Sequence, residues 1–237
     1  MLKIKRVSYL FVLLFFIIVL PAKASSNNLK ELSGEEKQKA LEKLKSFQKD
    51  IHSLVASVSQ EKQLVILKKK VNVDAKVTMA KPNMLRWDVT KPDRSITVID
   101  GETMTVYHSD IKEAQVYNLS ENLIARNTMS FFATAIGGNL DEMEKKFTVS
   151  IFSKDGEIIF KLVPLSGMTK RYLSDIIIYY DEETGFPRGF EVTTPKGERT
   201  ITKLTNIKIN PELKSDTFRI ALPDDVWITN RPEQINN

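Results

Sequence analysis

The sequence predicts a mainly β fold of the α+β class, in which about 10–11 antiparallel strands form a barrel or a strongly curled sheet. Three observations support this prediction. Apolar and polar residues alternate along most of the chain after residue 51, and turn motifs containing Gly separate the alternating stretches. Only residues 34–51 and about 119–143 carry apolar residues at helical spacing. Because an alternating strand has one apolar face, we expect the two helical pieces to cover the open end of the sheet.

The first 24 residues read as a cleavable signal peptide. A basic start, residues 1–6, precedes an apolar run over 7–20, and Pro21 ends that run. The run is shorter than the roughly 20 residues that span a bilayer, and Ala22-Lys23-Ala24 supplies small residues for cleavage before Ser25. An uncleaved anchor is the alternative interpretation. With cleavage, residues 25–237 form a single domain that works outside the inner membrane, in the periplasm.

The charge distribution excludes a nucleic-acid partner. The chain has 237 residues, with 35 Lys+Arg, 30 Asp+Glu and a net charge of +5. Four of its cations, Lys3, Lys5, Arg6 and Lys23, lie in the leader, which contains no acid. The remaining body is therefore nearly neutral and has no general basic field to attract phosphate.

The first predicted element of the mature chain is an amphipathic helix over residues 34–51. Ser33 and Glu36 have the spacing of a capping box at its start. An apolar stripe follows at spacings of three and four residues, formed by Leu41, Leu44, Phe47 and Ile51.

Alternation then predicts the strands. They lie at 54–59, 71–79, 96–98, 104–106, 147–151, 158–162, 173–180, 190–192, 200–209 and 218–220. A further strand is expected to follow Pro82 and to carry Trp87. Asp100-Gly101 and Asp155-Gly156 are two-residue hairpin signals, and Pro195-Lys196-Gly197 marks another turn. The second helical piece, at about 119–143, adds large flexible side chains that include Met129, Phe131, Phe132 and Met143. On pattern alone these residues either line a cavity or complete a solid core.

Residues suited to catalysis are few, which favours a binding protein over an enzyme. No nucleophile elbow, phosphate loop or zinc-protease motif occurs, and there is no Cys. His52 and His108 lie at strand boundaries, and Asp181-Glu182-Glu183 reads as a turn. We therefore expect no cofactor and no metal site.

An ordered set of motifs resembles the LolA family of periplasmic lipoprotein carriers. It begins with Leu54–Gln60 and continues with Lys81-Pro82-Asn83-Met84-Leu85-Arg86-Trp87, then Lys91-Pro92-Asp93, a strand ending in Asp100-Gly101, and Tyr107. Leu162-Val163-Pro164 and a closing segment from Phe218 to Val226 complete the set. The resemblance covers nearly all of residues 25–237, and its motifs are specific as a set rather than singly.

The resemblance implies an incomplete antiparallel β-barrel with a helical lid over an apolar cavity. Such a carrier binds the acyl chains of lipoproteins. It receives them from an inner-membrane lipoprotein-releasing ABC transporter and passes them to an outer-membrane lipoprotein acceptor, as a monomer without cofactor. Two alternatives remain: a LolA-like sensor or regulator that binds lipids or lipoproteins, and a carrier of another lipid.

Candidate site residues follow from the same comparison. Those expected to line the cavity or contact the lid are Met84, Leu85, Trp87, Val98, Met104, Met129, Phe131 and Phe132, with core packing as the competing role for each. Lys81 and Pro82 stand where the family has its lid latch. The family's basic residue there is usually Arg, and Lys lacks the planar fork of Arg, so we expect a weaker latch.

Overall fold

The structure is a computed structural model that describes residues 29–65, 68–120 and 140–230. In chain order the elements are β1 (Lys30–Glu31), α1 (Gly34–Gln48), β2 (Ser53–Leu64), β3 (Lys69–Ala80), β4 (Met84–Lys91), β5 (Ser95–Ile99), β6 (Thr103–His108), β7 (Glu113–Asn118), α3 (Leu140–Lys146), β8 (Phe147–Lys154), β9 (Glu157–Pro164), α4 (Gly167–Lys170), β10 (Asp175–Asp181), β11 (Pro187–Thr193), β12 (Arg199–Ile209) and β13 (Trp227–Asn230).

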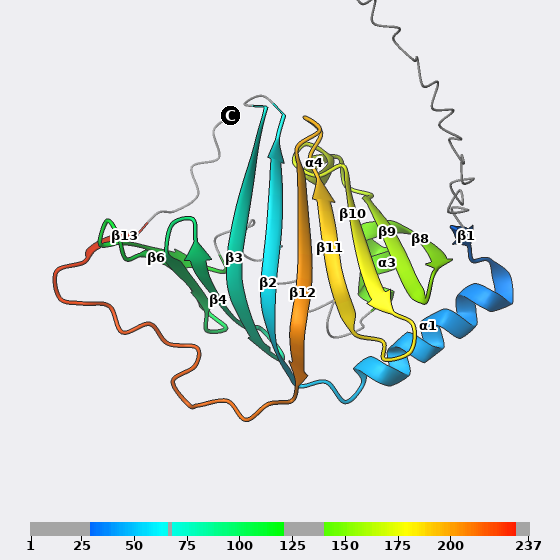
Figure 1. Ribbon diagram of the computed structural model, residues 1–237, viewed down its shortest axis with the longest axis horizontal. Helices are drawn as coiled ribbons and strands as arrows, with labels where there is room; N and C mark the ends of the chain where they lie inside the picture. The colour runs from blue at the N-terminus through cyan, green and yellow to red at the C-terminus, as the bar shows by residue number, and fades with distance from the viewer. Residues whose placement is uncertain (1–28, 66–67, 121–139, 231–237) are drawn as a thin grey trace, which may run out of the picture.

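All the described strands belong to one sheet, which does not close on itself. The sheet has 13 strands in the order β1-β8-β9-β10-β11-β12-β2-β3-β4-β5-β6-β7-β13. It bends strongly, so that its edge strands β1 and β13 lie at opposite sides of the molecule (Figure 1). The mainly β class and the incomplete barrel are confirmed. The helical cover is small. Alternation did not indicate three of the strands, namely β7, β13 and β1, and β1, with two residues, is too short to show a pattern.

The end of the sheet differs from the prediction. Residues 218–220 were expected to form the last strand, but backbone N–H groups of Thr217 and Arg219 donate to the carbonyls of Lys214 and Asp216, which makes consecutive turns. The last strand is β13, and it runs parallel to β7, whereas the other neighbours in the sheet are antiparallel. A three-residue apolar alternation is too short to distinguish a strand from a turn.

The two Asp-Gly motifs form turns of different length. Asp155 and Gly156 form the predicted two-residue turn, with φ of 50° and 79° respectively, as a type I′ hairpin requires. The Asp100-Gly101 hairpin instead has a third residue, Glu102. The Asp100 carboxylate accepts the N–H groups of Glu102 and Thr103 at 3.0 Å and 2.8 Å, which stabilises the wider turn and lowers the pKa of Asp100 against the opposing effect of burial.

The N-terminal helix starts where the sequence predicts it but is held differently. Ser33 is the N-cap residue of α1, yet its side chain makes no capping bond. Glu36 pairs with Lys30 at 2.6 Å instead of closing a capping box. The helix ends at Gln48 rather than at Ile51, and Ile51 enters the core after the chain has left the helix. Of the second predicted helical stretch, residues 140–143 belong to α3, Leu119 and Ser120 form a turn rather than a helix, and the remainder lies outside the described residues.

Candidate functional site: the inner face of the sheet

One face of the sheet carries a continuous apolar row. The register aligns Leu54, Met79, Leu85, Ile99 and Met104 across β2, β3, β4, β5 and β6. Directly opposed residues of antiparallel strands point to the same face. We call the face that carries this row the inner face.

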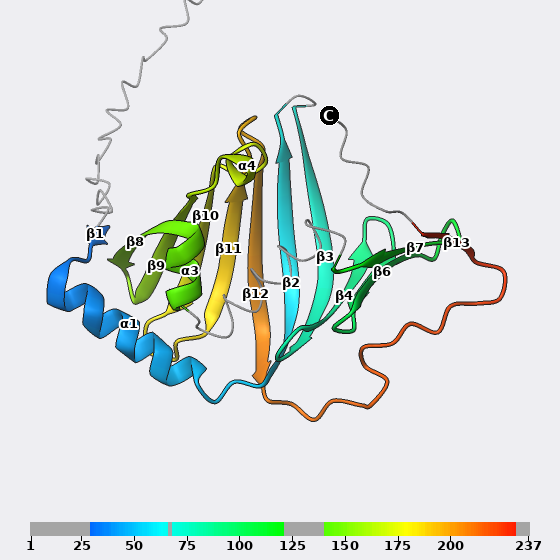
Figure 2. The same ribbon diagram turned by 180° about the vertical axis from the view of Figure 1, so that it is seen from behind.

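Apolar residues also lie on the inner face beyond β2. Val58 opposes Leu204 of β12, and Phe190 of β11 opposes Ile178 of β10. Ile178 in turn opposes Phe160 of β9. The inner face is thus mainly apolar from β6 to β9, apart from the hydrogen-bonded pair Gln60 and Thr202. Helix α3 lies on this face, behind the strands in Figure 1 and in front of them in Figure 2.

The inner face divides into two clusters. The first, which we call the open half, lies mainly on β2–β5 and consists of the buried residues Ile51, Leu54, Ala56, Val58, Ala75, Val77, Met79, Leu85, Ile99 and Leu119, with Trp87, Val89 and Met104 among the partly buried residues packed on them. Within the described part of the chain, no helix contributes a side chain to this cluster.

The second cluster, which we call the covered half, lies on β8–β11. Its buried residues are Leu44 of α1, Met143 of α3, and Ile151, Ile158, Phe160, Leu162, Ile176, Ile178 and Tyr180 of the strands. Phe160 and Tyr180 pack edge to face with ring centroids 5.3 Å apart, and both are 0 % exposed. Helices α1 and α3 therefore close this half of the face as an ordinary protein core.

The predicted cavity residues fall on both faces. Leu85, Trp87 and Met104 lie on the inner face; Leu85 is buried, whereas Trp87 and Met104 are only partly buried. Met84 and Val98 lie on the outer face, because they share the register of Arg86. Met129, Phe131 and Phe132 lie outside the described residues.

The outer face has its own cover at this point. Arg86 pairs with Asp88 at 2.9 Å, and its guanidinium donates to the carbonyls of Thr217 and Arg219 at 3.2 Å and 3.1 Å. The chain between β12 and β13 therefore passes over β4, and its course around this side of the sheet is visible in Figure 1. Val98, opposite Arg86, is 3 % exposed. Because Met84 and Leu85 are adjacent and both apolar, the sequence did not show which of the two points to the inner face.

Lys81 contacts the end of helix α1. Its Nζ donates to the carbonyl of Gln48 at 3.3 Å, and its backbone N–H donates to the His52 carbonyl at 2.8 Å. A cation suits the C-terminus of a helix, where carbonyl groups lack helical partners. Lys81 and Pro82 belong to the turn between β3 and β4, so the predicted latch connects this turn to α1.

A buried polar pair was missed by the sequence reasoning. Gln48 of α1 is 0 % exposed, as is Tyr180 of β10. Burial raises the pKa of Tyr180 far above its ordinary value, and the carboxamide of Gln48 beside it acts in the opposite direction. Gln48 lies four residues after Leu44 on the apolar stripe, and this spacing is the signal that could have identified it.

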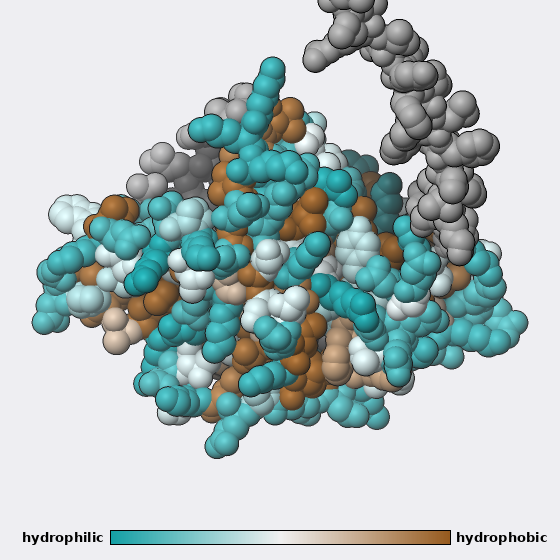
Figure 3. All heavy atoms as spheres, in the orientation of Figure 1, coloured by the Kyte–Doolittle hydropathy of each residue, from teal (hydrophilic) through white to brown (hydrophobic). Residues whose placement is uncertain are grey.

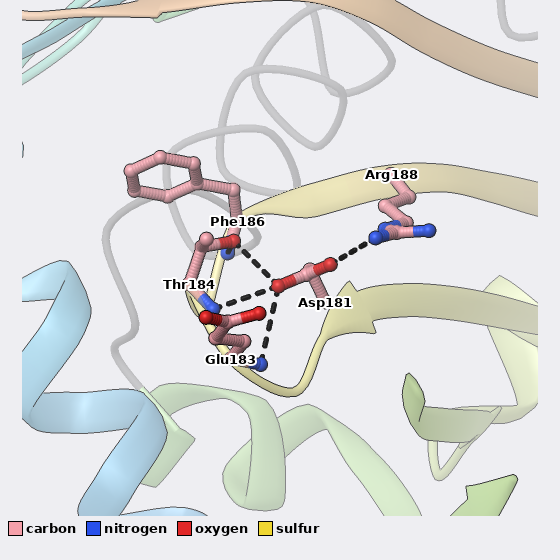
Figure 4. A network of polar contacts seen from close by, with 5 residues as sticks. All are labelled: Asp181, Glu183, Thr184, Phe186 and Arg188. Carbon is pink, nitrogen blue, oxygen red and sulfur yellow. Dashed lines mark hydrogen bonds and ion pairs between the residues drawn. The ribbon is translucent and has the colours of Figure 1, made fainter. Parts of the chain in front are cut away.

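The acidic turn after β10 is a structural turn. The Asp181 carboxylate accepts from the backbone N–H groups of Glu183 and Thr184 at 3.1 Å and 2.7 Å, from the Thr184 hydroxyl, and from Arg188 (Figure 4). These donors, with the Thr184 N–H first, lower the pKa of Asp181. Across residues 29–65, 68–120 and 140–230, no group of three or more potential ligands could hold a metal ion.

The fold and the face together define a class of protein: one large open sheet with an apolar inner face that small helices cover in part. Within that class, the chain belongs to the LolA family. The family model described as "Outer membrane lipoprotein carrier protein LolA" matches residues 49–221.

Individual relatives are distant. An outer-membrane lipoprotein carrier protein of Coxiella burnetii (strain CbuK_Q154) is 24 % identical over 143 residues, which are 60 % of this chain and 64 % of that protein. The chain thus matches less than two thirds of the length of that relative. The Legionella pneumophila (strain Corby) protein of the same name is 26 % identical over 192 residues, 80 % of this chain and 89 % of its own length.

A solved structure supports the fold. The crystal structure of an uncharacterized conserved protein from Thermus thermophilus superposes with a TM-score of 0.50 at 15 % identity, over 82 % of this chain and 99 % of that one. In the described part of the chain, no helix has the length and apolar character needed to cross a membrane.

Proposed function

We propose that this protein is a periplasmic carrier that binds the acyl chains of lipoproteins on the open half of its inner face. In this proposal it takes lipoproteins from an inner-membrane ABC transporter and delivers them to an outer-membrane acceptor. Membership of the LolA family and the names of the relatives support the cargo class. Residues 1–24 act as a cleaved signal peptide.

The observation that carries the proposal is the difference, within the described residues, in how helices cover the two clusters. Trp87, Val89 and Met104 remain partly exposed on the inner face, beside the fully buried Leu54 and Ile99. An acyl chain laid on this surface would remove more apolar area from water, and each buried methylene contributes about 0.8 kcal/mol. A carrier needs this affinity to be moderate, because the cargo must leave again.

Lys81 fits a latch at the boundary of this surface. It joins the β3–β4 turn to the carbonyl of Gln48, the last residue of α1, just before Ile51 enters the open half. In the proposed mechanism, breaking this bond loosens the contact between the β3–β4 turn and the end of α1 when cargo enters. A lysine, with one contact to Gln48, makes an easier latch to open than a forked arginine would.

Native mass spectrometry tests the cargo. The protein is expressed with its own leader, purified from the periplasm, and its mass is compared with that of a chain starting at Ser25. We expect co-purified triacylated lipoprotein. A phospholipid or glycolipid as the only adduct would replace the lipoprotein proposal with a carrier of another lipid, and an empty protein that also fails to bind a fluorescent fatty acid would contradict both.

A pair of variants on one strand tests the site. Trp87→Asp places a carboxylate on the inner face, and we expect the affinity for the fatty-acid probe to fall by at least about tenfold because the charge must be desolvated. Met84→Asp, on the outer face of the same strand, is the matched control and should bind like the wild type. Equal affinities for all three proteins would remove the open half from the proposal.

A further inference from the structure

The two ends of the sheet differ in charge. The end that carries the turn after β8, the turn after β10 and the turn after β5 is rich in acids: Asp100, Glu102, Asp155, Asp181, Glu182 and Glu183. The opposite end includes the β2–β3, β9–β10 and β11–β12 connections. Exposed cations are concentrated there, namely Lys68, Lys69, Lys170, Arg171 and Lys196. We call this second end the basic rim.

The three connections of the basic rim are held against one another. A Cβ at Gly197, in the β11–β12 turn, would lie 3.8 Å from Cγ2 of Val65, in the β2–β3 turn. The backbone N–H of Ser174, at the end of the β9–β10 connection, donates to the Thr193 carbonyl at 2.8 Å, just before the β11–β12 turn. The cations therefore share one surface rather than separate loops.

Large apolar side chains are exposed on the same rim. Leu165 and Val65 are each 51 % exposed, Met168 is 64 % exposed and Tyr172 is 71 % exposed. At the upper end of Figure 3, hydrophobic surface lies among hydrophilic side chains. Within the described residues, no ion pair neutralises Lys68, Lys170, Arg171 or Lys196.

We propose that the basic rim docks the protein on the surface of a bilayer that contains anionic phospholipid. Cations beside exposed apolar and aromatic side chains are the combination that binds such a surface, because the charges attract the headgroups while the apolar groups enter the interface. The acidic opposite end is repelled by the same membrane, so the charge asymmetry also orients the molecule. Docking of this kind is separate from acyl binding on the inner face.

The other exposed apolar site lacks the charge. Ile111, Trp227 and Ile228, at the β13 edge, are 65 %, 74 % and 55 % exposed. The neighbouring cation Lys112 is paired with Asp225. Apolar exposure without surplus positive charge gives no preference for anionic lipid, so this edge, whose apolar side chains are at least half exposed like those of the basic rim, provides a control surface.

Vesicle flotation tests the proposal. The periplasmic form is mixed with vesicles of phosphatidylglycerol and phosphatidylcholine in equal parts, or with phosphatidylcholine alone. We expect co-flotation with the anionic vesicles that weakens as salt is raised, because exposed charges are screened over about 8 Å at physiological ionic strength. The double variant Lys170→Glu/Arg171→Glu should lower the apparent affinity by roughly tenfold or more, and Met168→Ser/Tyr172→Ser should also lower it.

Two controls separate this proposal from the carrier function. Ile111→Ser/Ile228→Ser, on the β13 edge, should float like the wild type, and so should Trp87→Asp, whose inner face is altered. Thermal unfolding confirms that each variant is folded. The proposal would be overturned if the wild type did not float with the anionic vesicles, which is the result expected if the partner is an acidic protein surface. It would also be overturned if the rim variants floated as well as the wild type.

Discussion

The open and covered halves of the inner face are built from the same kind of strand but differ in what packs on them. In the covered half, Leu44 of α1 and Met143 of α3 complete a core around Phe160 and Tyr180. In the open half, within the described residues, strand side chains pack mainly on each other and leave Trp87 and Met104 partly exposed. One sheet can therefore use part of its apolar face for folding stability and keep another part for a ligand.

The largest expected effect compares one aromatic residue from each half. Phe160→Ala removes a ring that is 0 % exposed and packs on Tyr180, so we expect the free energy of unfolding to fall by about 3–5 kcal/mol. Trp87→Ala removes a partly exposed side chain and should cost about 1–2 kcal/mol. Urea unfolding followed by circular dichroism measures both. Equal losses would mean that the open half is a core like the other.

The next effect concerns how α1 is seated on the covered half. Gly185 has φ of +68°, and a Cβ there would lie 2.5 Å from Cδ2 of Phe47, so Gly185→Ala combines backbone strain with overpacking. We expect a loss of about 2–4 kcal/mol in the free energy of unfolding, measured by the same urea titration.

Gly156→Ala is the matched control for that variant. Gly156 has φ of +79°, but a Cβ there would meet nothing within 4 Å. It should cost only the backbone term of about 1–2 kcal/mol. If both variants lost the same stability, Phe47 could move aside freely, and the end of α1 would not be fixed by the β10–β11 turn.

The third prediction places an alkaline sensitivity in the covered half. Burial raises the pKa of Tyr180 in the folded protein far above its value of about 10 in the unfolded chain. Above about pH 10 the unfolded chain has therefore lost the phenolic proton that the folded protein keeps. The contribution of Tyr180 to the free energy of unfolding is fully present below about pH 10, and above that pH it falls by roughly 1.4 kcal/mol per pH unit. Tyr180→Phe should reduce that slope by the same amount.

Tyr179 gives the comparison for that slope. Burial, followed by its hydrogen bond to Glu191 at 2.9 Å, raises the pKa of Tyr179 to about 12. Tyr179→Phe should therefore change the pH dependence only between about pH 10 and pH 12. The free energy of unfolding of both variants is measured from pH 8 upward. A Tyr180→Phe variant with the wild-type slope would contradict the prediction.

The fold class was predictable because alternation is a local property of the chain. Leu54, Ala56 and Val58 are all buried on one face, as their spacing indicates. The split between the open and covered halves was not predictable, because it depends on which strands α1 and α3 reach after folding. Met84 and Val98 show the same limit at the scale of single residues: the register with Arg86, set by long-range pairing, decides their face.

The smallest expected effect tests the contact at the boundary of the two halves. Lys81→Met removes the cation that bonds the Gln48 carbonyl at 3.3 Å, and we expect a loss of about 0.3–1 kcal/mol, since the contact is partly solvated. Lys81→Arg keeps the charge and is the control for stability and for hydrogen exchange. Because the bond holds only the last turn of α1, hydrogen exchange should speed up at residues 45–49 in Lys81→Met and remain unchanged in β9 and β10.

A latch also predicts faster release of the fatty-acid probe from Lys81→Met and slower release from Lys81→Arg, whose fork can reach a second carbonyl. Local exchange that changes while both release rates stay at the wild-type value would leave Lys81 as a helix-end contact and remove it from the carrier mechanism.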